Sequence, residues 1–96
     1  MGLDLTKLGY DNYGVDIYLT SSSRNKELHE FFKCHPNIYQ VHYTIGGADV
    51  EIELFVKNLQ HLIDIIEKIK IKFRDVIDYI DYFSYSSIIR MNYVPD

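Results

Sequence analysis

The chain has 96 residues, a formal net charge of −4 and 47% hydrophobic residues. This length limits it to one domain, and the hydrophobic content excludes a disordered chain. The acidic balance disfavours nucleic acid as a direct partner, and no apolar run approaches the roughly 18 residues that a membrane span needs.

The N-terminal half begins with a predicted strand and a predicted helix. Residues 1–9 are expected to be a lead-in to a single domain over residues 10–96. A strand is predicted over residues 10–19, where apolar and polar side chains alternate. Its apolar side consists of Tyr13, Val15, Ile17 and Leu19. After a serine loop, a helix is predicted over residues 26–33, because Leu28, Phe31 and Phe32 recur at helical spacing before Pro36.

A β-hairpin is predicted next, from two alternating segments over residues 38–45 and 50–56. Gly46 and Gly47 stand between them, and glycine readily supplies the positive φ of a tight hairpin turn. Since side chains alternate along a strand, Tyr43 and Ile45 are expected to face the helices. His42 and Thr44 are then expected to face the other way.

A second helix is predicted from Asn58, as its N-cap, to about Phe73. Its expected buried face is Leu59, Leu62, Ile63, Ile66, Ile69 and Phe73. Residues 76–94 are expected to be extended, as one long strand or as two short ones.

The element order β-α-β-β-α-β predicts an α+β, ferredoxin-like fold, with or without an extra C-terminal strand. In this fold a four-stranded antiparallel sheet carries both helices on one face, which leaves the other face bare. A bare aromatic face is typical of a partner surface. We expect two copies to meet there with C2 symmetry. The expected contact residues are Tyr18, His42, Thr44 and Phe55, together with Gln40 and some of Tyr79, Tyr82, Phe83 and Tyr85 on the same face.

The run from His35-Pro36 through the hairpin and into the second helix resembles a known family. It is similar to the effector-binding domain of leucine-responsive and asparagine-synthetase-type regulators (Lrp/AsnC), including the turn Gly46 to Asp49. The lead-in Lys7-Leu8-Gly9-Tyr10 is similar as well, so the resemblance covers roughly residues 3–94. Many members carry an acidic residue where this chain has Gly47.

The resemblance implies a site at the hairpin turn, where contacts between dimers bind a small effector such as an amino acid. The amides of Gly46, Gly47 and Ala48 would bind its carboxylate, and Asp49 would meet its ammonium group. The alternative is a plain hairpin turn in which Asp49 bonds its own backbone.

Other site chemistries find little support in the sequence. Cys34 and His35 are not part of a spaced set of metal ligands such as Cys-x-x-Cys, and no third group is apparent that would orient them for catalysis. His35 is therefore expected to cap the helix end, and Cys34 to pack as a small apolar residue. Glu51 and Glu53 share a strand face, where such a pair is more often solvated, or paired with cations across a subunit contact, than catalytic. Two glutamates on the sheet face where RNA would lie also argue against an RNA-binding domain. No catalytic residue, metal or cofactor is therefore expected. One cysteine without a signal peptide favours the cytoplasm.

The resemblance implies the ligand-sensing and oligomerisation domain of an Lrp/AsnC-like transcriptional regulator. DNA would be bound by a helix-turn-helix that is absent from these residues. One alternative is a small-molecule or enzyme module on the same fold, similar to siroheme decarboxylases. Another is a dimerisation domain without a ligand. The identity of the effector stays open, as does the choice between a fragment and a stand-alone domain.

Overall fold

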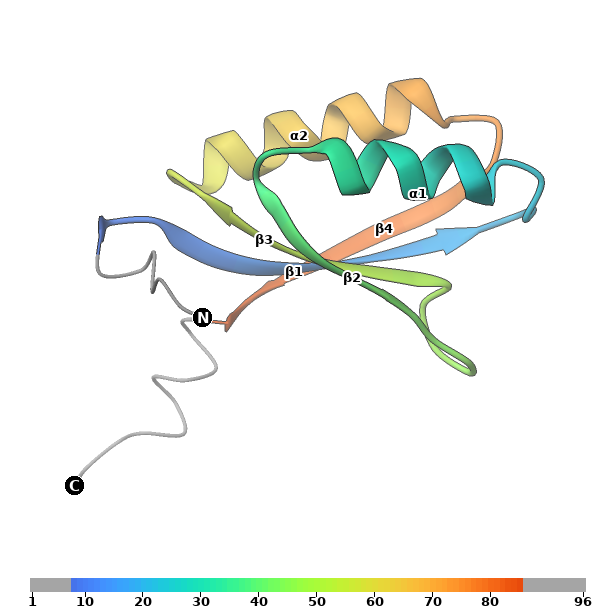
Figure 1. Ribbon diagram of the computed structural model, residues 1–96, viewed down its shortest axis with the longest axis horizontal. Coiled ribbons are helices and arrows are strands. Elements are labelled where there is room, and N and C mark those ends of the chain that lie inside the picture. The colour runs from blue at the N-terminus through green and yellow to red at the C-terminus, as the bar shows by residue number, and fades with distance from the viewer. Residues whose placement is uncertain (1–7, 86–96) are drawn as a thin grey trace.

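The computed structural model describes residues 8–85 as one sheet covered by two helices (Figure 1). The elements are β1 (Asp11–Leu19), α1 (Asn25–Cys34), β2 (Ile38–Tyr43), β3 (Val50–Val56), α2 (Leu59–Lys72) and β4 (Ile77–Ser84). The strand order is β2-β3-β1-β4, and all neighbouring strands are antiparallel. The predicted ferredoxin-like fold is confirmed. Most of the lead-in and the extra C-terminal strand lie outside the described residues.

The core forms where the alternating apolar sides of the central strands meet the helices. In β3 the alternation is complete, and Val15 and Ile17 of β1 stand opposite Ile52 and Val50. All four of these side chains are at most 2% exposed. Because a period of two divides each strand between two faces, the same pattern sends the polar residues of β1 and β3 to the face opposite the helices.

Helix α2 begins as predicted but buries a slightly different face. The Asn58 side chain accepts a hydrogen bond from the His61 backbone N–H at 2.9 Å, which caps the helix. The buried stripe is Leu62, Ile65, Ile66 and Ile69, continued by Phe73. Leu59, predicted to be buried, is 46% exposed. At 100° per residue, Leu59 and Ile65 lie on opposite flanks of this stripe, each about 60° from its centre, and only Ile65 is buried.

The hairpin departs from the simple alternation at both ends of β2. A bulge between Ile38 and Gln40 turns Tyr39 to the face opposite the helices, where its ring stacks on Phe55 at 4.7 Å. Tyr43 faces the helices as predicted, and its hydroxyl contacts the His29 ring of α1.

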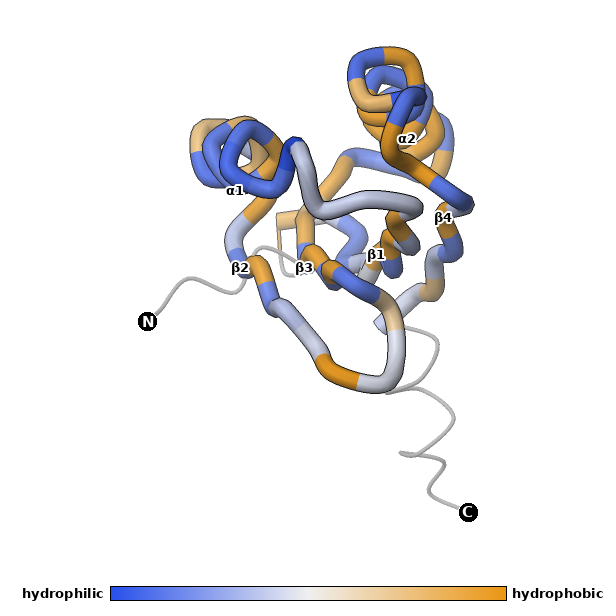
Figure 2. The backbone as a smooth tube through the Cα atoms, turned by 90° about the vertical axis from the view of Figure 1, so that its right-hand side faces the viewer, coloured by the Kyte–Doolittle hydropathy of each residue, from blue (hydrophilic) through white to orange (hydrophobic). Residues whose placement is uncertain are grey.

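Beyond Tyr43 the chain leaves the sheet, and the turn extends away from the helices (Figure 2). The expected helix-facing position of Ile45 is wrong, since this residue is fully exposed in the turn. Only Gly46 of the two turn glycines has a positive φ, of 84°. The positive φ that was predicted for both turn glycines is therefore found at Gly46 alone.

One side chain fastens the start of α1 to the end of α2. The Arg24 guanidinium lies 4.5 Å from the centre of the Phe73 ring and donates to the Lys72 carbonyl at 3.0 Å. It also pairs with Asp75 at 2.6 Å and with Glu27 at 2.7 Å. Through these contacts Arg24 ties the end of the loop between β1 and α1 to the C-terminal end of α2.

We predict that Ile66→Ala destabilises the domain far more than Lys70→Ala. Ile66 is 5% exposed, so its truncation leaves a cavity that costs about 2–5 kcal/mol in the free energy of unfolding. Lys70 is exposed, and its truncation should cost less than about 0.5 kcal/mol. Denaturant unfolding of both variants measures the difference. Equal midpoints would contradict the packing of α2 described here.

Candidate functional site

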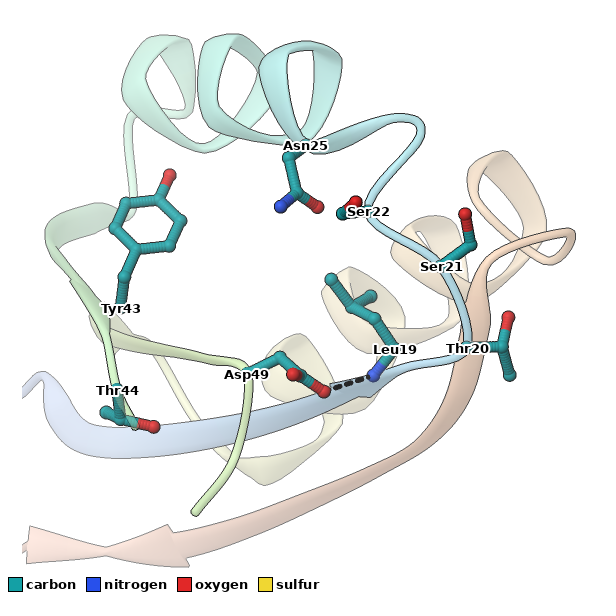
Figure 3. Close-up of a pocket in the computed structure, with 8 residues that line it drawn as sticks. All are labelled: Leu19, Thr20, Ser21, Ser22, Asn25, Tyr43, Thr44 and Asp49. Carbon is teal, nitrogen blue, oxygen red and sulfur yellow. Dashed lines mark hydrogen bonds between the residues drawn. The ribbon is translucent and has the colours of Figure 1, made fainter. Parts of the chain in front are cut away.

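The end of β1, the loop leading to α1 and the base of the hairpin line an open pocket of about 440 Å³ (Figure 3). Segments far apart in the sequence build it, which is why the sequence alone did not identify it. Its lining residues are Leu19, Thr20, Ser21, Ser22, Asn25, Tyr43, Thr44 and Asp49.

Asp49 fixes one wall of the pocket. Its carboxylate accepts a hydrogen bond at 2.8 Å from the backbone N–H of Leu19, which is 30 residues away in the chain (Figure 3). The expected alternative, a turn in which Asp49 bonds its own backbone, is replaced by this contact. The bond holds the start of β3 against the end of β1. It leaves the carboxylate exposed to the pocket, able to accept further donors.

The other residues of the predicted turn site lie elsewhere. Gly46 and Gly47 do not line this pocket. Ala48 is 7% exposed, and its carbonyl accepts a hydrogen bond from the Thr44 hydroxyl. The structure therefore brings Asp49 together in the pocket lining with Thr44, which was expected at the oligomer contact, whereas Gly46 and Gly47 are not part of that lining.

Polar groups face Asp49 across the pocket. Asn25, at the start of α1, and Tyr43, at the end of β2, extend toward the same space (Figure 3). The hydroxyls of Ser21 and Ser22 lie on the intervening loop. Hydroxyl and amide groups can donate to a carboxylate, and Asp49 can accept from an ammonium group. The serine run after the first strand was the one sequence signal for this wall.

The sheet surface opposite the helices, here called the open face, forms the second candidate site. Tyr18 of β1 stacks on Tyr79 of β4 at 4.3 Å, and Tyr39 stacks on Phe55 near the other end of the face. Tyr18 and Phe55 thus lie where the prediction placed them. By contrast, Tyr82 faces the helix side, where its ring lies edge-on to Tyr13 at 6.2 Å.

His42 also lies on the open face, paired with Glu53 through its Nε2 at 2.8 Å. Glu53 receives a second hydrogen bond from the Tyr39 hydroxyl at 3.1 Å. Thr44 lies beyond the end of β2, beside the pocket, rather than on the open face. Of the four predicted contact residues, Tyr18, His42 and Phe55 share this surface.

Three carboxylates run across the middle of the open face. Asp16 of β1 stands opposite Glu51 of β3 on one side and Asp81 of β4 on the other. We call Glu51, Asp16 and Asp81 the acidic row. Burial, and then the negative charges of Glu51 and Asp81, raise the pKa of Asp16. The ionised form of Asp16 is therefore disfavoured in the folded domain.

Among residues 8–85, no group of three or more His, Cys, Asp and Glu side chains is arranged to hold a metal ion. His35 ends α1 as predicted, with its backbone N–H donating to the Phe32 carbonyl. The expectation that Cys34 packs as a small apolar residue is wrong, because it is exposed. Neither helix of the described region has the length and apolar character that a membrane span requires.

Several solved structures with the same fold are of transcriptional regulators. AsnC of E. coli superposes with a TM-score of 0.73 at 19% identity, over 88% of this chain and 56% of that one. An AsnC family regulator from Agrobacterium tumefaciens gives 0.73 at 17% identity, again over 88% and 56%. A Neisseria meningitidis regulator, solved as a complex with L-methionine, gives 0.74 at 6% identity, over 88% and 55%.

These likenesses confirm the predicted resemblance to Lrp/AsnC effector-binding domains at the level of fold. The chain spans little more than half the length of these regulators, 56% for AsnC of E. coli. No protein-family profile matches the sequence, and no curated protein matches it either.

We predict that Asp16→Asn stabilises the domain at neutral pH. Because the folded-state pKa of Asp16 is raised, ionising it costs more in the folded than in the unfolded state. The favourable contribution of protonated Asp16 is complete below about pH 3.9, its unfolded pKa, and is lost as the pH rises through the folded value.

The midpoint of thermal unfolding should therefore rise in Asp16→Asn at pH 7, and the gain should vanish at about pH 3.5. Asp64→Asn is the matched control, because Asp64 is exposed on α2. A gain that is equal at both pH values, or shared by Asp64→Asn, would contradict the electrostatic account.

Proposed function

We propose that this chain is the ligand-sensing and oligomerisation domain of an Lrp/AsnC-like transcriptional regulator. The observation that carries the proposal is the superposition of 88% of the chain on regulators such as AsnC of E. coli. Binding to DNA would require a helix-turn-helix, an element absent from the described residues 8–85. On this proposal, the domain reports a small molecule and joins subunits, and it carries out no reaction.

The pocket beside Asp49 is the proposed effector site, and a free amino acid is the ligand class that fits it. Asp49 supplies the acceptor for an ammonium group, and Ser22 and Asn25 offer donors for a carboxylate. Leu19 and Tyr43 supply apolar surface for a side chain. The complex of one structural neighbour with L-methionine supports this ligand class.

The open face is the proposed contact between subunits. Tyr79 is 51% exposed and Tyr39 is 45% exposed, although both are large rings on one flat surface. Aromatic rings are enriched at the centre of protein contacts, because they remove large areas from water with little loss of side-chain entropy. A second copy placed by a two-fold axis would cover these rings on both subunits at once.

We predict that the chain is at least a dimer at micromolar concentration. Light scattering coupled to gel filtration should give at least twice the 11.4 kDa chain mass. Tyr18→Ala with Phe55→Ala should shift the mass toward one chain, because both rings lie on the open face. Ile71→Ala is the control, since Ile71 is 62% exposed on α2 and should not affect the mass. A monomeric wild-type chain would remove this part of the proposal.

We predict that Asp49→Asn weakens amino-acid binding while the fold is retained. The amide oxygen of asparagine can still accept the Leu19 N–H, so the wall of the pocket is preserved. The lost charge should cost about 1.5–3 kcal/mol of binding free energy. This corresponds to roughly a ten- to hundredfold loss of affinity.

A thermal-shift screen of the amino acids selects the ligand first, and calorimetry then compares the variants. Asp64→Asn, on the exposed side of α2, should bind as the wild type does. An unchanged affinity in Asp49→Asn would place the ligand elsewhere. No stabilisation by any amino acid would favour a dimerisation domain without a ligand.

A further inference from the structure

The four strands contain no lysine or arginine, and every described Lys and Arg lies on a helix or in a loop. The open face therefore has carboxylates at its centre and His42 as its one group that can become cationic within residues 8–85. The charge on this surface is one-sided, which constrains what can cover it.

The carboxylates of the open face differ in how far they are satisfied. Glu53 pairs with His42 and accepts from Tyr39, and Glu51 accepts from the Tyr85 hydroxyl at 3.0 Å. Asp16 and Asp81 receive no hydrogen bond or ion pair from any other residue of the described region. The carboxylate oxygens of Asp16 and Asp81 thus receive no donor from the described part of the chain.

The stacked aromatic pairs lie at opposite ends of the face, with the acidic row between them. The exposed rings favour a protein surface as the partner. A second identical copy, however, would bring another row of three carboxylates onto the same contact. Like charges brought together in a desolvated contact are unfavourable, whereas opposite charges fix the choice of partner.

We propose that the open face favours a partner surface that carries Lys or Arg opposite the acidic row over an identical copy of this chain. The partner is a second flat, partly aromatic surface, such as a related sheet, with cations at its centre. Arginine fits best, because its guanidinium binds carboxylates through two hydrogen bonds and stacks on aromatic rings. The inference rests on the proposed function only in taking the open face as the subunit contact.

A charge-reversed form of this chain supplies the partner for the test. Asp16→Lys/Asp81→Lys places cations at the two carboxylates of the acidic row that no other described residue pairs with. Wild-type and reversed chains, one of them carrying a mass label, are mixed at pH 7 and low salt, and native mass spectrometry counts the pairs. Mixed pairs should exceed the statistical half of all dimers, with an affinity about tenfold or more above that of the wild-type pair. Added salt should reduce this excess.

A neutral variant keeps the test decisive if the reversed chain does not fold. Asp16→Asn/Asp81→Asn should pair with itself more tightly than the wild type at pH 7 and low salt, because two repelling carboxylates are removed from each copy. Raising the salt concentration should tighten the wild-type pair, since its rows repel.

The outcomes separate this inference from the proposed homodimer. A wild-type monomer that pairs with the reversed chain supports the inference and removes the homodimer. A wild-type dimer with statistical mixing, and with a neutral variant of equal affinity, overturns the inference and leaves the homodimer intact. Wild-type and reversed chains that both stay monomeric, alone and when mixed, overturn both.

Discussion

A sheet covered on one face only is the constraint on which the rest of this structure depends. Strand alternation sends Val15, Ile17 and Ile52 toward the helices, and the same alternation sends Asp16, Glu51 and Tyr18 away from them. The apolar stripe of α2 packs against the apolar side of the sheet and buries it. The other face holds rings and charges that the two helices do not cover. The candidate subunit contact is thus a direct consequence of the fold.

The pocket arises from a second constraint, the hydrogen bond between Asp49 and the Leu19 backbone. It fixes the base of the hairpin against the end of β1, and the serine loop and the start of α1 line the other side of the pocket. Arg24 fixes the far end of that loop through Phe73 and Asp75. A ligand bound at Asp49 would therefore contact the hairpin and the entry to α1 at once. The hairpin strands β2 and β3 also form part of the open face. A ligand that shifted the hairpin would therefore alter the proposed subunit contact.

The sequence predicted what local rules determine and missed what long-range contacts determine. β3 and the Asn58 cap were predicted to the residue, because alternation and capping are local. The face that Tyr39 takes was not predicted, since the bulge that turns it arises only when β2 pairs with β3. Ile45 was assigned to a strand that ends at Tyr43. The pocket wall formed by Leu19 to Ser22 was not predicted, because the residues around Asp49 give no indication that it contacts Leu19, 30 residues away.

The central claim is that the open face, not the helices, joins this chain to its partner. Isotope-filtered NMR on a mixture of labelled and unlabelled chains observes contacts between subunits alone, at a concentration where dimers dominate. The account predicts intermolecular contacts at the rings of Tyr18, Tyr39 and Phe55, and none at Ile71 of α2. Intermolecular contacts at Ile71, with none at the rings, would contradict it.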